Sequence, residues 1–465
     1  MKAIVIGCGM AGSRVASDLH ARDRDVKVTV FGAERHPPYN RIMLSTLLAG
    51  RAAEEDLAMT GPPAGMDVRL GVRVTAIDPD RRLVITPDEV VEYDALVLAT
   101  GARAVYPALP GLDAPTVRAF RTLDDCRAIV AGAATARAAI VLGGGLLGLE
   151  TARGLAGRGL AVTVVHAGPH LMDRQLDAGG AEVLARTLDG LGVAVRLGAR
   201  ALRWTGAGLD LADGTTIPAD LLVLACGARP DTDLAAAAGI AVRRGVLVDH
   251  ALRTSDPHVW AIGDCAEHDG TVYGLVAPAW EQADTVADRL TGATTCYRGT
   301  RPVIRLKATG LDVAAMGSVA DHPDAEVVSF ADPARGTYAR LVIRDDRLAG
   351  AVLLGDNPSV GTVVQLFDRD AEVPEDRRSL LLGRSFGAVQ PARSESPAFL
   401  PAQALVCRCN SVTKAAITDR WRDGARTVPE IVTTTRATTG CGGCRDAVTG
   451  IVDWLAAAES EEGSP

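Results

Sequence analysis

The sequence predicts an α/β fold with two β-α-β modules, followed by an α+β domain and a small helical domain. Two apolar runs, beginning at Lys2 and at Ala139, each lead into a glycine turn, a helical pattern and a second apolar run. The segment Asp94–Arg103 recurs as Asp220–Arg229 with eight of ten residues identical, which indicates duplicated modules. Two unrelated buried strands are the alternative, but they leave the shared Gly-Ala-Arg ending unexplained.

Composition narrows the class of protein. A chain of 465 residues has room for about three domains of roughly 150 residues. Hydrophobic residues make up 48% and charged residues 23%, which is a globular balance. The net charge of −8 disfavours binding to nucleic acid. No apolar run reaches the roughly 18 residues that a membrane span needs, and the first residues lack a secretory signal, so we expect a cytoplasmic protein.

The first glycine turn spans Gly7–Gly12, between a predicted strand over Lys2–Ile6 and a predicted helix over about Met10–Ala21. The next predicted strand ends near Phe31 and is followed by Glu34. Glycines allow a pyrophosphate to approach closely, helix N–H groups face its charge, and an acid at this place accepts hydrogen bonds from a ribose. The pattern predicts a Rossmann-type dinucleotide site with contacts from Gly7, Gly9, Met10, Ala11, Gly12 and Glu34.

The second glycine turn, Gly143–Gly148, has the same setting between a strand that begins at Ala139 and a strand over Val162–Val165. His166 stands where an acid would accept a ribose hydroxyl, and no arginine beside it favours a 2′-phosphate. The choice between NADH and NADPH therefore stays open, and His166 is either a solvent-facing strand end or a cofactor contact. The expected contacts are Gly143, Gly145, Leu146, Leu147, Gly148 and His166.

Two further motifs, Ala99–Gly101 and Val259–Ala266, complete a resemblance of residues 1–295 to the two-dinucleotide flavoproteins of the glutathione reductase type. The resemblance implies that the first module binds FAD and that an inserted module binds NAD(P)H. It places Asp264 at the ribityl chain of FAD. The other contacts that it implies are Thr100, Gly101 and Gly263 for FAD, and Glu150 and Gly227 for NAD(P)H.

The cysteines of this region depart from the disulfide reductases of that family, which carry a redox cysteine pair. Here the cysteines stand singly, and small isolated cysteines are commonly buried and inert. We therefore expect structural roles for Cys8, Cys126, Cys226, Cys265 and Cys296.

The segment Glu34–Ser45 resembles the FAD-binding segment of ferredoxin reductases and of the flavoprotein half of NAD(P)H-dependent nitrite reductases. The resemblance implies that Arg41 lies near the FAD pyrophosphate; an exposed surface arginine is the alternative. Thr46 stands where the ferredoxin reductases usually have lysine, which favours the nitrite-reductase branch. The segments Leu171–Asp177 and Arg305–Asp312 are also similar to that branch.

A cysteine-bearing domain lies near the C-terminal end. It contains a Cys-x-Cys pair and a Cys-Gly-Gly-Cys turn that leads into a predicted helix over Arg445–Leu455, with a frayed tail from Glu459. The two sulfurs of Cys-x-Cys share one face of an extended segment, so both can reach one centre. The pattern resembles bacterioferritin-associated ferredoxin modules, which bind one [2Fe–2S] cluster; a zinc site is the alternative. The expected ligands are Cys407, Cys409, Cys441 and Cys444, with Arg408, Lys414, Arg436 and Arg445 as candidate basic neighbours.

The two dinucleotide motifs and the cysteine motif together predict an electron relay. Reduced nicotinamide gives two electrons together, a [2Fe–2S] cluster takes one at a time, and flavin can do both. No general acid or base is expected, because hydride transfer depends on stacking and orientation. Resemblance implies the electron-transfer subunit of an assimilatory nitrate or nitrite reductase, with a separate catalytic protein as acceptor.

Two alternatives stay open at this point. One is a ferredoxin-type reductase that serves an oxygenase or another redox partner, and the other is a non-enzymatic iron–sulfur sensor or docking protein. Neither oligomeric state nor nicotinamide preference follows from the residues. The predicted parts are an FAD domain at 1–112 and 241–295, an NAD(P) domain at 113–240, an α+β domain at 296–384, a linker at 385–403 and a [2Fe–2S] domain at 404–458.

Overall fold

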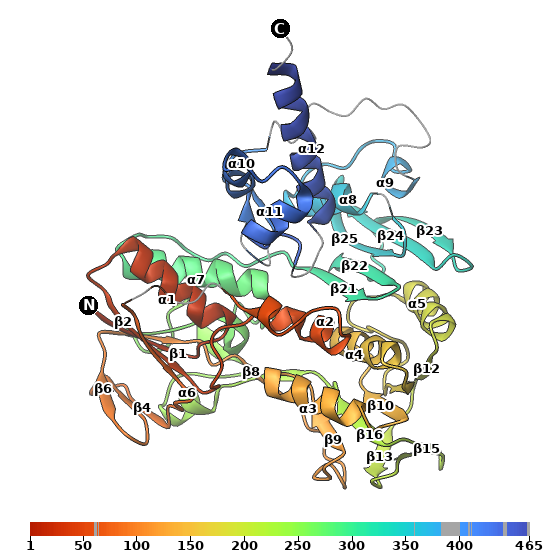
Figure 1. Cartoon of the computed structure of the whole chain (residues 1–465), viewed down its shortest axis with the longest axis horizontal. Helices are drawn as coiled ribbons and strands as arrows, with labels where there is room; N and C mark the ends of the chain where they lie inside the picture. Colours follow the sequence, from red (N-terminus) through yellow and green to blue (C-terminus); the bar gives the residue numbers. More distant parts are fainter. Residues whose placement is uncertain are drawn as a thin grey trace.

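The computed structural model describes residues 1–59, 63, 65–357, 359–382, 400–407, 410, 412–439 and 444–462. The predicted ligands Cys409 and Cys441, together with Arg408 and most of the predicted linker, lie outside these residues. Figure 1 shows two parallel sheets with their helices, a third, antiparallel sheet and a helical C-terminal domain. This arrangement confirms the predicted fold class.

The first module contains β1 (Lys2–Ile6), α1 (Met10–Arg22), β2 (Lys27–Gly32), β3 (Asp67–Leu70), β7 (Ala95–Leu98), β19 (Val259–Ala261) and α7 (Val276–Leu290). Its strands are parallel in the order β19-β7-β1-β2-β3. The helices α1 and α7 pack against each other, and Val5, Leu19 and Val286 are part of the core that they share with the sheet. Because β19 pairs with β7, the chain leaves this sheet and returns to it after the second module.

Smaller elements surround this sheet. They are the 3₁₀ helices Arg41–Met43, Glu55–Leu57 and Gly263–Cys265, the helices α2 (Leu44–Leu48) and α6 (Asp233–Ala237), the antiparallel strands β4 (Ala76–Asp78), β5 (Leu83–Ile85) and β6 (Val90–Glu92), and the parallel pair β18 (Val246–Val248) and β20 (Ala266–His268). The first two 3₁₀ helices flank α2, whose Leu44 and Leu48 pack in the core of the second module.

The second module contains β9 (Val117–Ala119), α3 (Leu123–Ala133), β10 (Ala138–Leu142), α4 (Leu146–Gly157), β11 (Ala161–Val165), α5 (Ala178–Gly190), β12 (Val193–Arg196) and β16 (Leu221–Leu224). Its sheet is parallel in the order β12-β11-β10-β16-β9. A small antiparallel sheet adds β13 (Ala201–Trp204), β14 (Gly208–Leu211) and β15 (Thr216–Pro218).

The internal repeat occupies equivalent places in the two modules. The first copy forms β7 beside β1, and the second forms β16 beside β10. Their Gly-Ala-Arg endings form β8 (Ala102–Ala104) and β17 (Ala228–Pro230), which pair with each other antiparallel. Since position and sequence repeat together, duplication explains the similarity better than convergence of two buried strands.

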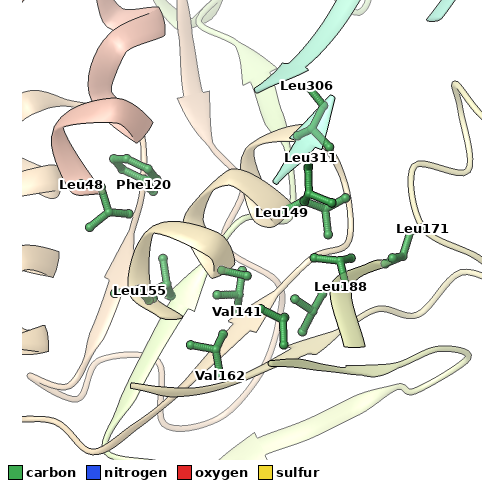
Figure 2. Packing of buried hydrophobic residues seen from close by; sticks show 14 of the residues in the cluster. Leu48, Phe120, Val141, Leu149, Leu155, Val162, Leu171, Leu188, Leu306 and Leu311 are labelled. Atoms are coloured by element: carbon green, nitrogen blue, oxygen red, sulfur yellow. The ribbon is translucent and has the colours of Figure 1, made fainter. Parts of the chain in front are cut away.

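The third domain is an antiparallel sheet in the order β21-β22-β25-β24-β23, with strands β21 (Val303–Ala308), β22 (Leu311–Gly317), β23 (Glu326–Asp332), β24 (Thr337–Arg344) and β25 (Arg347–Leu354) and helices α8 (Val360–Asp368) and α9 (Ser379–Leu382). Asp345 and Asp346 have positive φ of 50° and 56°, as a two-residue hairpin turn requires. Leu306 and Leu311 of this sheet join the core of the second module next to Leu149 (Figure 2).

The C-terminal domain contains β26 (Leu405–Cys407), β27 (Val412–Thr413), α10 (Lys414–Arg422), α11 (Val428–Thr435) and α12 (Arg445–Glu462). The expected frayed tail is wrong for 459–462, because α12 continues through Glu462; residues 463–465 lie outside the described residues. Glu459 accepts hydrogen bonds from Trp421 Nε1 at 2.8 Å and from Arg426 Nη1 at 2.7 Å, which fastens this last part of α12 to the domain. Among the described helices, none is long and apolar enough to cross a bilayer.

Candidate functional site

A cavity of about 330 Å³ opens at the carboxyl edge of the first sheet. It is bounded by the turn after β1, the ends of β2, β7 and β19, and the start of α7. Parallel strands bring these ends to one edge, which is where open α/β sheets bind ligands. The predicted FAD contacts that line it are Gly7, Gly9, Met10, Ala11, Glu34, Arg41, Thr100, Gly101, Gly263 and Asp264.

Each glycine of the first turn has a separate steric reason. Gly7 has φ of +113°, and a Cβ there would lie 2.1 Å from Ala99 O. A Cβ on Gly12 would lie 1.8 Å from Gly7 O, so Gly12 lets α1 pack against the turn and does not itself line the cavity. A Cβ on Gly9 would meet nothing within 4 Å. Gly9 therefore leaves an open surface where the free N–H groups of α1 can face an anion.

The second turn repeats this geometry. Gly143 has φ of +121°, and a Cβ there would lie 2.2 Å from Ala225 O. A Cβ on Gly148 would lie 2.0 Å from Gly143 O, whereas Gly145, the N-cap of α4, has open space around it. The second module therefore offers an anion at the start of α4 the same cradle as the first module. The other predicted contacts here are Leu146, Leu147 and Glu150 in the first turns of α4, and Gly227, which has φ of +97° and an open Cβ position.

His166 lies against the second glycine turn and does not point into solvent. Its side chain is 16% exposed, and Nδ1 accepts a hydrogen bond from Gly144 N–H at 3.2 Å. The ring proton of the neutral form is therefore on Nε2. That nitrogen is buried without a hydrogen-bond partner in the described part of the chain, 3.7 Å from Asp173 Oδ2. His166 thus carries a donor at the strand end where an acid accepts hydrogen bonds from NADH.

A chain of polar contacts runs along the first cavity. Glu34 accepts from Tyr39 Oη at 2.8 Å and from Arg41 Nη2 at 2.6 Å. Burial raises the pKa of Tyr39, so the phenol stays protonated and can donate. Arg41 Nη1 donates to Arg121 O at 2.6 Å, and Arg121 Nη2 donates to Asp264 Oδ2 at 2.5 Å. The two predicted FAD-binding carboxylates are therefore held by one continuous polar network.

Sequence reasoning missed Arg121, which lies beside this cavity. It precedes the capping box of Thr122 and Asp125 at the start of α3, and no glycine or charge motif marks it. The start of α7, Gly274–Val276, also lines the cavity and was not predicted. Gly274, two residues before this helix, was the available signal, since a glycine there marks a helix start that can face a ligand.

The cysteines of the two modules are poor nucleophiles. Burial raises the pKa of Cys8, Cys126 and Cys226 to about 11, and it also raises the pKa of Cys265. None of these four will carry an appreciable thiolate near neutral pH, which agrees with structural roles. Cys8 lies in the wall of the first cavity, whereas Cys296 is exposed.

The C-terminal domain brings its two cysteine loops together. Cys407 ends β26 and Cys444 precedes α12, and both side chains are buried in one small core. Asn410 Nδ2 donates to Arg436 O at 2.6 Å and to Thr439 Oγ1 at 3.2 Å, so it ties the loop after Cys407 to the loop before Cys444. Cys409 and Cys441 lie outside the described residues; four thiolates would suit an iron–sulfur cluster or zinc, and the start of α12, next to Cys444, favours negative charge.

Two of the candidate basic neighbours, Lys414 and Arg436, have contacts of their own. Lys414 Nζ donates to Leu400 O at 2.9 Å and lies 4.6 Å from the centre of the Trp454 ring. Arg436 donates to the backbone carbonyl of Asp56 in the first module, and Arg445 is exposed. Lys414 and Arg436 therefore have packing and interdomain contacts of their own.

Two glycine turns in tandem, the first followed by a cavity-lining acid, define a flavin- and nicotinamide-dependent oxidoreductase. The chain belongs to the pyridine nucleotide-disulphide oxidoreductase family, whose model matches residues 1–283. Residues 302–368 match the rubredoxin NAD+ reductase C-terminal domain, and residues 405–454 match the BFD-like [2Fe–2S] binding domain. These matches confirm the predicted enzyme class and the predicted cofactors FAD, NAD(P)H and [2Fe–2S], the last of these over zinc.

Individual proteins extend the similarity. The assimilatory nitrate reductase electron transfer subunit of Bacillus subtilis (strain 168) is 34% identical over 98% of this chain and 60% of its own length. The NAD(P)H nitrite reductase of the same organism is 35% identical over 96% of this chain and 56% of its own length. The chain thus spans three fifths or less of these relatives. The putidaredoxin reductase–putidaredoxin complex superposes with a TM-score of 0.74 and 26% identity, covering 80% of this chain and 94% of that chain.

Proposed function

We propose that this chain passes electrons from NAD(P)H through FAD and its [2Fe–2S] cluster to a separate catalytic protein, an assimilatory nitrate or nitrite reductase. The observation that carries the proposal is the cluster domain that follows the two dinucleotide modules in a chain that aligns over 98% and 96% of its length with these two relatives. Flavin supplies the chemistry that accepts a hydride and releases electrons singly. Each NAD(P)H oxidised therefore supplies two electrons, which leave one at a time.

We assign one cofactor to each of three of the predicted domains. The FAD domain comprises 1–112 and 241–295, the NAD(P) domain 113–240, the α+β domain 296–384, the linker 385–403 and the cluster domain 404–458. The first cavity would hold FAD, the cradle at Gly143–Gly148 would hold the nicotinamide nucleotide, and the four C-terminal cysteines would hold the cluster. The cavity lining, the matched glycine geometry and the tie between the cysteine loops support these assignments.

The residues of the first cavity bind and orient. Glu34, which accepts hydrogen bonds from Tyr39 and Arg41, would also accept hydrogen bonds from a ribose of FAD. The start of α1, beyond Gly9, would face the pyrophosphate of FAD, and Asp264, which lines the same cavity, would accept hydrogen bonds from the ribityl hydroxyls. Apolar walls at Met10 and Ala11 exclude water from the ligand. None of these groups needs to move a proton.

We place the reaction in the cytoplasm, since cluster ligands must stay reduced and cytosolic thiols are kept so. A ferredoxin-type reductase is the second candidate, and the similarity to putidaredoxin reductase and the rubredoxin reductase domain favours it. A sensor or docking role for the cluster domain is the third candidate. It requires a cluster that NAD(P)H does not reduce.

Acceptor assays separate the first two candidates. The purified holoprotein is mixed in turn with a nitrate reductase catalytic subunit, a nitrite reductase and a ferredoxin–oxygenase pair. Oxidation of NAD(P)H is followed by its absorbance at about 340 nm. About one NAD(P)H should be oxidised for every two electrons delivered to the acceptor. We expect turnover with nitrate or nitrite present and their reductase added. Turnover with the ferredoxin pair alone would replace the first candidate by the second.

A further inference from the structure

The C-terminal domain lies against the wall of the first cavity. Ile42 lines that cavity and also packs against the core of the C-terminal domain, which includes Trp421 and Cys444. Figure 1 shows the C-terminal domain, drawn blue, beside the first module. One side chain therefore touches both the proposed flavin site and the proposed cluster domain.

Arg436 makes a second contact across the same boundary. It caps α11 in the left-handed conformation, with φ of +60°, and its Nη2 donates to Asp56 O in the first module. Its own carbonyl accepts from Asn410, which ties the two cysteine loops together. The backbone of Arg436 thus belongs to the cysteine loops, while its side chain holds the first module.

The carbonyl that Arg436 holds is coupled to the cavity wall. Asn40 N–H donates to Leu57 O at 2.7 Å, directly after Asp56, and Met59 N–H donates to Pro38 O at 3.2 Å. These bonds join the segment around Asp56 to the segment that begins at Pro38 and continues into Arg41 and Ile42 of the cavity wall. A displacement of Asp56 O would therefore shift the segment that contains Arg41 and Ile42, which line the cavity.

We propose that Arg436 is a positioning residue that docks the cluster domain on the first module, at Asp56 O and beside Ile42 of the cavity wall, so that electrons pass from the flavin to the cluster within one chain. The inference rests on the proposed relay, and it adds where the cluster domain receives its electrons. Transfer between two centres weakens steeply with their separation. A contact that keeps the domain at the cavity wall therefore controls the rate of cluster reduction without touching hydride transfer.

The test compares Arg436→Ala with Arg422→Ala in the full holoprotein. Arg422 is 72% exposed on α10 of the same domain and pairs with Asp419 of its own helix, so it is a matched control. Hydrogen exchange of the 38–43 segment is measured without NADH, and stopped-flow then follows flavin and cluster absorbance separately. Arg436→Ala should speed exchange at the Asn40 amide and slow cluster reduction by about tenfold, the order expected for one lost hydrogen bond to a charged donor.

Flavin reduction, FAD content and iron content should stay at the wild-type level in both variants. Arg436→Lys, which keeps a donor for Asp56 O, should restore much of the cluster reduction rate even if the alanine variant folds poorly. Unchanged exchange and unchanged cluster reduction in Arg436→Ala would overturn the docking while leaving the relay intact. Loss of iron from Arg436→Ala would also overturn it, since the residue would then serve cluster binding. A wild-type cluster that NADH never reduces would instead overturn the relay itself.

Discussion

Replacement of Gly148 by alanine should impair use of NAD(P)H while FAD stays bound. The new Cβ would lie 2.0 Å from Gly143 O, and Cβ atoms essentially never approach closer than 3.0 Å, so α4 must withdraw by about 1 Å. The start of α4 is the proposed pyrophosphate cradle of the second module. A displacement of about 1 Å near a bound substrate can lower the rate about 100-fold, and overpacking costs about 1–3 kcal/mol in stability.

The assay is steady-state reduction of an artificial dye by NAD(P)H, with bound FAD measured from its absorbance. We expect kcat/KM for NAD(P)H to fall between tenfold and 100-fold (order of magnitude from the misplacement above), with FAD content unchanged. Gly157→Ala is the control, because it lies on the same helix and its Cβ would meet nothing within 4 Å. That variant should keep its activity and gain up to about 1 kcal/mol in stability. Wild-type kinetics in Gly148→Ala, or equal losses in both variants, would refute the reasoning.

Three further predictions concern the other sites. Cys444→Ser should remove iron while leaving bound FAD and dye reduction intact. The control Cys296→Ser, at an exposed cysteine, should leave iron content, FAD content and dye reduction unchanged. Loss of FAD together with the cluster would argue against separate domains. Glu34→Ala should weaken FAD retention by about tenfold on dilution, the order expected for lost ribose hydrogen bonds; equal retention would remove Glu34 from the site. Burial lowers the pKa of His268 from its usual 6.5, so the folded chain resists a protonation that the unfolded chain accepts. The free energy of unfolding should therefore fall as the pH drops below about 6.5, by at most about 1.4 kcal/mol per pH unit. Denaturant unfolding of His268→Gln should show a flatter pH dependence there, and parallel curves would contradict this origin.

The parts of the site that were predictable lie close together in the sequence. Gly7 to Gly12, Glu34 and their counterparts at Gly143 to Gly148 each sit within one strand–turn–helix unit, so local chemistry fixes both their conformation and their neighbours. The two cysteine pairs were likewise recognised from spacings of two and three residues in the sequence. The predicted roles of these residues as ligand contacts stay predictions, although their placement around the cavity and in the cysteine loops supports them.

The parts that were missed depend on distant segments. Arg121 contacts Arg41 from 80 residues away and Asp264 from 143 residues away, so nothing local indicates its place at the cavity. The extension of α12 depends on Glu459 meeting Trp421, 38 residues earlier, and a terminal run of small and acidic residues alone resembles a frayed end. The orientation of His166 depends on the backbone of Gly144 in another loop.

Anaerobic stopped-flow of the wild-type holoprotein with NADH tests the relay most directly. The account predicts that the flavin band bleaches first and that the cluster band follows in the same molecules, at a rate independent of protein concentration. A cluster that stays oxidised after the flavin is fully reduced, or that is reduced only at a rate proportional to protein concentration, would contradict it.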